Sequence, residues 1–493
     1  MEKIAKKQFI LAIDLGTTSI RTLAYDTYSN EFININQRKI KQYYPQPSWV
    51  EQDANEIMSV INYCLKKTVA DLPQDSIYGL GLTNQRETIV AWQKSTGKPL
   101  ANAIVWQCRR THELCEQLKQ NKRIYKMIRS KTGLFPDSYF SATKIAWLLQ
   151  NNTAVQEALK NNDLCVGTLD SFVVFNLTNG QSFITDTSNA SRTLLFNITT
   201  QDWDNDLLQF FDIPREILPN VVASDCYVGD TIISKKKIAI GGILGDQQAS
   251  LLGQCCTNAG EAKTTFGTGA FMLCNIGKKP VLTNDLITTI AWTTRQGTSY
   301  AFEGNMYSAG ACINWLIDRL AIIDSAKESE TLAKSVPDNG GVYFVPALSG
   351  LGAPFWKSNA RAQFHGLTLA TTDAHLVRAV LASIAYNTRA VFDSINSAVN
   401  LEKMPMRVDG GMTANSMFIQ YLSNILHSPI SVSAERESTS LGACFMCGLA
   451  FGAFDDLDSL HQYYHASKTY TPAPHNPINE NHYLEWLKLI EKC

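Results

Sequence analysis

Two short segments that combine glycine with threonine, each between stretches of strand-like residues, place the strongest constraint on the fold of this chain. The first is Asp14–Ser19 (DLGTTS), which lies between the apolar runs Phe9–Ile13 and Ile20–Ala24. The second is Phe266–Gly269 (FGTG), in the other half of the chain, again between runs with strand character. A repeated unit of this kind predicts two lobes built on one plan. We expect the lobes to face each other across a cleft.

The length and charge of the chain agree with two lobes and exclude other classes of protein. At roughly 150 residues per domain, 493 residues suggest two to four domains, most simply two large lobes. Lys plus Arg (44) nearly balance Asp plus Glu (45), and no long block carries one sign. Because nucleic-acid and anionic-membrane binding depend on clustered basic charge, neither is expected. The composition, 45% apolar and 18% charged, is typical of a folded globular protein.

The chain shows no pattern of an export signal or a membrane span. The apolar stretch Phe9–Ile13 ends at Asp14 and is too short for a signal-peptide core. The longest uncharged run, Ser438–Phe454, is shorter than the ~20 residues that span a bilayer, so we expect a buried helix there. The twelve cysteines should be reduced, and Cys444 and Cys447 should pack in the core rather than bind metal. These features predict a cytoplasmic protein without membrane insertion.

The positions of the histidines limit the chemistry available to the middle of the chain. None of the eight lies between residues 113 and 364. A catalytic base in that segment must therefore be a carboxylate, and Ser-His-Asp hydrolysis and His-ligated zinc are disfavoured. Neither a GxxxxGK[ST] loop nor a GxGxxG motif occurs, so a nucleotide would have to be held by other means.

Periodicity and capping residues predict further elements. These are a helix that begins at Asp53, strands Ile77–Thr83 and Thr88–Trp92, a long helix Leu376–Ile395, a strand Met406–Asp409 and a helix from about Asn415 to His427. Gly410 and Gly411 lie between the last strand and the last helix. Two residues without Cβ let a flat or anionic group approach the backbone at a helix N-terminus.

Two carboxylates are candidates for chemistry, and each has a simpler explanation. Asp14 ends a strand before a turn rich in hydroxyls, an arrangement that can bind phosphate and its Mg²⁺; alternatively, the turn is a surface hairpin. Asp246 lies in segment 245–248, which follows the small-residue run 241–244, and could accept a hydroxyl proton at the edge of a cleft. Alternatively, Asp246 caps the N-terminus of a helix.

A second group of residues could recognise a small polyol. Arg86 and Glu87 together can donate to and accept from vicinal hydroxyls, although adjacent opposite charges are more often a surface ion pair. Trp106, Tyr139 and Phe271 could cover a carbon skeleton, although aromatic residues at strand ends usually belong to the core.

Taken together, the motifs resemble the FGGY carbohydrate kinases. The resemblance rests on segments 14–19, 81–88, 103–111, 138–144, 189–193, 245–248, 266–269, 350–354 and 408–411, which occur in the family's order. It implies an α/β, two-lobed fold of the actin/hexokinase (ribonuclease-H-like) type, with ATP and substrate in the interlobe cleft. The implied lobes are residues 1–253, with the substrate site and first phosphate turn, and 254–493, with the nucleotide site and second phosphate turn.

The resemblance also implies a role for individual residues. Asp246 resembles the catalytic base. The residues that resemble substrate ligands are Arg86, Glu87, Trp106, Tyr139, Asp246, Gln247 and Phe271. Those that resemble nucleotide contacts are Thr17, Thr18, Ser19, Arg21, Thr268, Gly310, Asn314, Gly411 and Asn415. Asp14 resembles the acid on the magnesium side, so the implied cofactors are ATP and Mg²⁺.

The activity implied by the resemblance is ATP-dependent phosphorylation of glycerol to sn-glycerol 3-phosphate, the first step of glycerol catabolism. The alternative within the family is a kinase for another polyol or sugar, such as erythritol, xylulose or gluconate. An actin- or chaperone-like ATPase is the alternative from another class. The expected partners are glycerol and ATP, with a homodimer or homotetramer and no nucleic acid.

Four positions depart from the family's usual pattern. Leu15 and Asn314 each stand where many members have Gln. Segment 232–240 contains three lysines but not the glycines of the loop that binds an inhibitory sugar bisphosphate in some bacterial members. Segment 224–227 lacks the His that is phosphorylated in others. Both forms of regulation are therefore expected to be absent.

Overall fold

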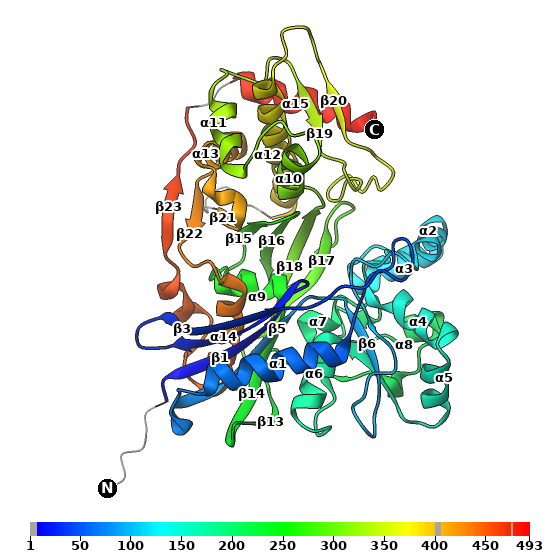
Figure 1. Ribbon diagram of the computed structural model, residues 1–493. Helices are drawn as coiled ribbons and strands as arrows, with labels where there is room; N and C mark the ends of the chain where they lie inside the picture. Colours follow the sequence, from blue (N-terminus) through cyan, green and yellow to red (C-terminus); the bar gives the residue numbers. More distant parts are fainter. Residues whose placement is uncertain (1–6, 400–405, 475–476) are drawn as a thin grey trace.

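Two β-sheets organise the computed structural model, which describes residues 7–399, 406–474 and 477–493 (Figure 1). The first sheet has the strand order β13-β14-β5-β1-β2-β3 and the second β17-β18-β16-β15-β21-β22-β23. The strands of the first are β1 (Phe9–Leu15), β2 (Ser19–Asp26), β3 (Glu31–Lys39), β5 (Ile77–Asn84), β13 (Tyr227–Ile233) and β14 (Lys236–Gly245). Those of the second are β15 (Ala262–Phe266), β16 (Ala270–Gly277), β17 (Ile287–Thr294), β18 (Gly297–Met306), β21 (Met406–Asp409), β22 (Ile430–Ser433) and β23 (Ala466–Tyr470).

The two sheets share one plan. Each contains an antiparallel hairpin, β1–β2 or β15–β16, that carries one of the Gly-Thr turns. The first strand of each hairpin pairs in parallel with β5 or β21, which in turn pairs in parallel with β14 or β22. The prediction of two lobes with one topology is therefore confirmed.

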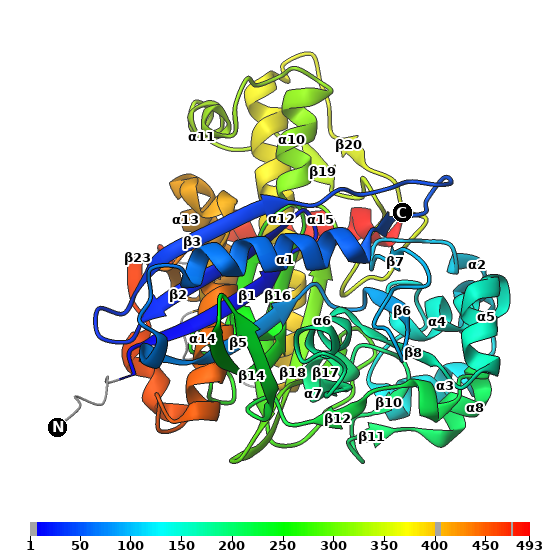
Figure 2. The same cartoon turned by 60° about the horizontal axis from the view of Figure 1, so that its bottom comes forward.

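Strand β1 is an almost continuous apolar run because both of its faces are covered. Side chains alternate between the faces of a strand. Leu11 and Ile13 belong to one buried cluster with residues of α1 (Ala54–Val69), whereas Ile10 and Ala12 belong to another with residues of α14 (Ser438–Phe451). Figure 2 shows α1 lying along this sheet.

Helices α9 (Asp246–Gly253) and α14 pack closely between the two sheets (Figure 1). A Cβ on Gly253 would lie 1.8 Å from the backbone oxygen of Ser438, and one on Gly442 would lie 1.8 Å from that of Ala249. These two glycines therefore permit the helix contact. Because α14 also packs on β1, β5 and β14, a helix from the second half of the sequence covers the first sheet. The lobe boundary after residue 253 stays a prediction.

The remaining elements extend each lobe. Around the first lie the four-stranded sheet of β4 (Glu51–Gln52), β6 (Ile89–Gln93), β7 (Ala103–Ile104) and β8 (Leu164–Thr168) and the helices α2 (His112–Gln120), α3 (Lys122–Thr132), α4 (Ser141–Asn151), α5 (Thr153–Lys160), α6 (Leu169–Leu177), α7 (Thr187–Ala190) and α8 (Asn205–Phe211). Around the second lie α10 (Gly310–Asp318), α11 (Ala326–Lys334), α12 (Asp373–Ala398), α13 (Ser416–Leu426) and α15 (Pro477–Glu491).

The predicted elements agree with the structure except between β21 and α13. Asn415 caps α13, but residues Gly411–Ala414 form a 3₁₀ turn before it, so the glycine pair does not lead directly into the helix. Segment 438–451 is a buried helix, and Cys444 and Cys447 are buried, unpaired thiols, as expected. Within the described residues, no helix combines the length and apolarity that crossing a membrane requires.

Candidate active site

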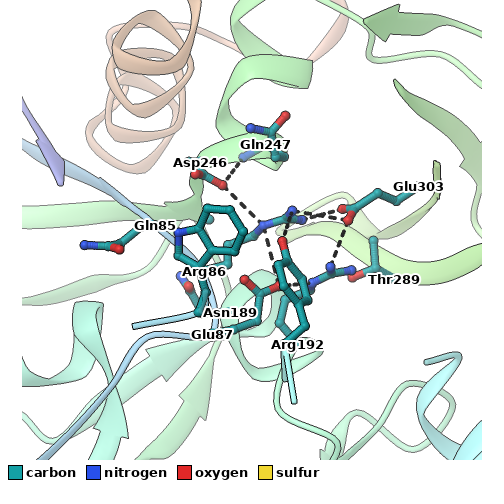
Figure 3. Close-up of polar contacts among 12 residues, drawn as sticks. Gln85, Arg86, Glu87, Asn189, Arg192, Asp246, Gln247, Thr289 and Glu303 are labelled. Atoms are coloured by element: carbon teal, nitrogen blue, oxygen red, sulfur yellow. Dashed lines mark hydrogen bonds and ion pairs between the residues drawn. The ribbon is translucent and has the colours of Figure 1, made fainter. Parts of the chain in front are cut away.

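A buried network of two arginines and two glutamates forms the centre of the candidate site (Figure 3). Arg86 and Glu87 lie in the tight turn after β5, where Glu87 has the left-handed φ of 62°, and strained backbone of this kind clusters at functional sites. Both residues are at most 2% exposed, so the alternative of a surface ion pair is wrong. Arg86 and Glu87 are therefore a charged pair of the protein interior.

Glu303 of β18 and Arg192, which follows α7, complete this network. The Oε1 atom of Glu303 accepts from Nη2 of Arg86 (3.2 Å) and from Nη2 of Arg192 (2.8 Å). Arg192 Nε in turn donates to Oε1 of Glu87 (2.7 Å). Burial would by itself raise the pKa of Glu303, but the guanidinium groups of Arg192 and Arg86 lower that pKa to about 2. Glu303 is therefore a permanent anion among the cations.

Asp246 begins α9 on the opposite side of Arg86 from Glu303 (Figure 3). Its Oδ1 lies 3.2 Å from Nε of Arg86 and accepts from the backbone N–H of Gln247 (2.7 Å). The helix cap is Gly245, so Asp246 is not the N-cap that the simpler interpretation required. Although the carboxylate lies deep in the molecule, 30% of its side chain remains accessible. An accessible carboxylate beside a fixed guanidinium can accept a proton from a bound hydroxyl.

The pKa of Asp246 reflects opposing influences. Burial raises it and outweighs the guanidinium of Arg86 and the backbone N–H of Gln247, which favour the ionised form. The pKa of Glu87 is raised in the same way, by burial, against the nearby charges of Arg86 and Arg192. Asp246 is thus a stronger base than a solvated aspartate.

Lys263 connects the second sheet to this site. It is fully buried on β15, and its Nζ donates to Oε1 of Gln247 (2.7 Å) and Oγ1 of Thr265 (2.9 Å). Burial lowers the pKa of Lys263 to about 8, although the carboxylates of Asp409 and Asp246 oppose this change. The predicted substrate ligand Gln247 therefore directs its side-chain oxygen toward Lys263.

The three predicted aromatic side chains are all partly exposed rather than enclosed in the core. The rings of Trp106 and Tyr139 meet edge to face, with centroids 5.5 Å apart. Nε1 of Trp106 donates to Oγ1 of Thr17 (3.0 Å), and Tyr139 Oη lies 3.5 Å from Nη2 of Arg86. Tyr139 and Trp106 thus link the arginine to the first Gly-Thr turn. Phe271 lies on β16 opposite Asn305 of β18.

A cavity of about 570 Å³ lies next to the second Gly-Thr turn. Five predicted nucleotide contacts line it: Thr268, Gly310, Asn314, Gly411 and Asn415. Gly410 comes directly before the lining residue Gly411 and has a φ of 94°. A Cβ on Gly410 would lie 2.3 Å from the backbone oxygen of Phe266. The turn therefore requires glycine at Gly410.

The other four predicted nucleotide contacts, Thr17, Thr18, Ser19 and Arg21, lie on the first hairpin and do not line this cavity. Thr18 is exposed, Ser19 Oγ accepts from Nε2 of Gln37 (2.8 Å), and Arg21 pairs with Glu437. The structure therefore divides the predicted nucleotide contacts between the cavity and the first turn.

Asp14, the residue predicted to lie on the magnesium side, carries a carboxylate with a raised pKa. Burial raises its pKa to about 7 against the opposing charge of Arg21, and the carboxylates of Asp246 and Glu437 raise it further. A cation bound there would relieve this accumulation of negative charge. No group of three or more His, Cys, Asp or Glu side chains arranged to hold a metal occurs among the described residues. Mg²⁺ usually binds through one or two carboxylates together with substrate phosphates.

Glu303, Arg192 and Lys263 were not among the predicted site residues. Glu303 lies within β18, far from the motifs, and Lys263 lies within β15, just before the second Gly-Thr turn; no motif assigned a role to either residue. Arg192 belongs to segment 189–193, one of the segments that carry the family resemblance, but no role was assigned to it there.

Comparisons with known proteins agree with this architecture. Residues 9–253 and 262–451 match the N-terminal and C-terminal domains of the FGGY family of carbohydrate kinases. The chain is 44% identical over 490 residues to a glycerol kinase of Parabacteroides distasonis, with 98% of each chain covered. It is 42% identical over 493 residues to a glycerol kinase of Bacillus cereus, with 98% of this chain and 99% of the relative covered.

Solved structures show the same fold. The crystal structure of Plasmodium falciparum glycerol kinase with ADP has a TM-score of 0.92 and 36% identity, and covers 99% of this chain and 98% of its own. A ligand-bound xylulose kinase from Lactobacillus acidophilus has a TM-score of 0.88 at 21% identity, covering 98% and 97% of the two chains. The second likeness concerns the fold alone.

Proposed function

Because this chain belongs to the FGGY family of carbohydrate kinases, we propose that it transfers the γ-phosphoryl group of ATP to a terminal hydroxyl of glycerol. The product is sn-glycerol 3-phosphate, and the reaction is the first step of glycerol catabolism. The observation that carries the proposal is the accessible carboxylate of Asp246 beside the buried Arg86–Glu87 pair. The carboxylate can deprotonate a polyol hydroxyl, and the charged pair can bind the neighbouring hydroxyls.

Asp246 is the catalytic base. The attacking hydroxyl oxygen forms a bond to the γ-phosphorus, the bond from the γ-phosphorus to its bridging oxygen breaks, and ADP leaves. The hydroxyl proton passes to Asp246. Its raised pKa makes the carboxylate a better acceptor than a solvated aspartate, while Arg86 at 3.2 Å supports its ionised form.

Most of the acceleration comes from alignment. Ordered reactants can remove about 7–11 kcal/mol of a barrier. Arg86 and Glu87 hold vicinal hydroxyls, and Trp106 and Phe271 cover the carbon chain. These apolar faces also exclude water, which competes with glycerol as a nucleophile.

Asp14 would hold Mg²⁺, directly or through water, and the chemistry that the cation would supply there is neutralisation of charge on the phosphate oxygens. The two Gly-Thr turns supply backbone N–H groups and hydroxyls for the same oxygens. The adenine-bearing part of ATP occupies the cavity lined by Thr268, Gly411 and Asn415.

ADP release with and without glycerol tests the proposal, followed by dihydroxyacetone, erythritol, xylulose and gluconate at equal concentration. We expect ADP release to depend on glycerol and to match the sn-glycerol 3-phosphate formed. Equal release without any polyol would support the ATPase alternative, and faster release with erythritol, xylulose or gluconate would support another kinase of the family. The cytoplasmic location and the homodimer or homotetramer stay predictions.

A further inference from the structure

Building on the proposed function, we propose that Glu303 is a positioning residue for the substrate. In this proposal one buried carboxylate from the second sheet holds Arg86 directly and Glu87 through Arg192. Neither the family resemblance nor the sequence motifs assign a role to this residue.

The geometry of Glu303 supports this role. Its Oε2 accepts from Nη1 of Arg86, and its Oε1 accepts from Nη2 of both Arg86 and Arg192. A carboxylate that binds one guanidinium through two oxygens fixes the plane of that group as well as its position. Figure 3 shows both arginines directed toward Glu303.

Arg192 carries this ordering to Glu87. Its Nη2 binds Glu303 and its Nε donates to Glu87 Oε1 at 2.7 Å, so a single guanidinium joins the two carboxylates. Arg192 and Glu303 are completely buried, and a buried charge that loses its partner is strongly destabilising. Glu303 therefore acts through the arginines rather than by touching substrate.

The network also joins the two lobes. Glu303 belongs to β18 of the second sheet, whereas Arg86 and Glu87 follow β5 of the first. A carboxylate of the second sheet thus holds the two charges that follow β5 of the first sheet: it binds Arg86 directly and Glu87 through Arg192. Because its pKa is about 2, Glu303 retains its charge across the physiological range.

Loss of the Glu303 charge would change the position of Arg86. The remaining carboxylates near Arg86 are Asp246, with Oδ1 at 3.2 Å from Nε, and Glu87, with Oε1 at 3.8 Å. We expect Arg86 to move toward them and away from the orientation that serves the glycerol hydroxyls. Hydrogen bonds from charged groups contribute enough that losing one substrate contact weakens binding ~10–100-fold.

The test compares Glu303→Gln with a matched variant, Glu261→Gln. Glu261 is also a buried glutamate paired with an arginine (Arg407, 3.0 Å), but it lies outside the site. In Glu303→Gln we expect the KM for glycerol to rise ~10-fold or more while the KM for ATP stays close to that of the wild type. Glu261→Gln should leave both values unchanged.

A second readout separates positioning from general structural damage. The ratio of kcat/KM for glycerol to that for 1,3-propanediol measures recognition of the vicinal hydroxyl. We expect this ratio to fall ~10-fold in Glu303→Gln, since the lost contact is one that only glycerol makes. Glu303→Asp keeps the charge, but its side chain is too short to reach both arginines, so this variant should lower the ratio as well. It replaces Glu303→Gln in the test if the Gln variant does not fold.

Two outcomes would contradict the inference. One is an active wild type whose glycerol KM and substrate ratio are unchanged in Glu303→Gln or Glu303→Asp, which would leave the proposed function intact. The other is an equal rise in the KM values for glycerol and ATP with an unchanged ratio, which would assign Glu303 a structural role. A wild type that does not phosphorylate glycerol would instead refute the proposed function, and this inference with it.

Discussion

Replacement of Asp246 by Asn removes the proposed base while preserving the size and shape of the side chain. A general base accelerates reactions ~10²–10⁴-fold, so we expect kcat to fall at least ~100-fold. A loss of ~100-fold corresponds to about 2.7 kcal/mol of activation free energy. Asp246 lies outside the lining of the 570 Å³ cavity, so the affinity for nucleotide should be almost unchanged.

The pH dependence supplies an independent test of the same role. Asp246 must be ionised to accept a proton, and burial raises its pKa. The kcat/KM of the wild type should therefore decrease as the pH falls through this raised pKa, and the residual activity of Asp246→Asn should lack the part of the decrease that Asp246 causes; protonation of Asp14, whose pKa is raised to about 7, would affect both proteins. ADP release at saturating ATP, measured across a series of pH values with glycerol varied, gives both profiles.

Stability measurements show whether any loss of activity reflects misfolding. A carboxylate whose pKa is higher in the folded than in the unfolded state lowers stability above the unfolded pKa. Asp246→Asn should therefore unfold at a temperature no lower than the wild type at pH 8. Near-normal turnover in a folded Asp246→Asn variant, or a pH profile identical to that of the wild type, would refute the assignment of Asp246 as base.

Two further predictions concern residues outside the charge network. Asn415→Ala should cost ~0.5–2 kcal/mol of stability because the Asn415 side chain accepts from the Phe418 N–H at 2.9 Å and caps α13; it should also raise the KM for ATP. Asn415→Ser should restore the melting temperature, and a normal ATP KM in the Ala variant would remove Asn415 from the nucleotide site. Burial, and to a smaller extent the charge of Asp186, raises the pKa of Asp170 to about 7. Because the ionised carboxylate destabilises the folded state, Asp170→Asn should unfold at a higher temperature than the wild type at pH 8. This difference in unfolding temperature should vanish near pH 4. A difference independent of pH would contradict this explanation.

Several features of the fold could be predicted because they depend on local sequence. Turn residues and strand periodicity identified both hairpins, and Asp53 marked the start of α1. The uncharged segment around Cys444 and Cys447 correctly predicted a buried helix. The 3₁₀ turn after Gly410 could not be predicted, because its conformation follows from the close approach of this turn to the backbone of Phe266.

The sequence by itself determined that this chain forms two similar lobes, that its candidate base is a carboxylate, and which family it resembles. These conclusions follow from residue types and spacings, which act over a few neighbouring positions. Only the tertiary structure decided that Arg86 and Glu87 are buried and that Arg192 and Glu303 hold them in place. Glu303 is 217 residues from Arg86 along the chain. Such a contact forms only when two sheets pack together, because buried charges must then find partners wherever the packing brings them.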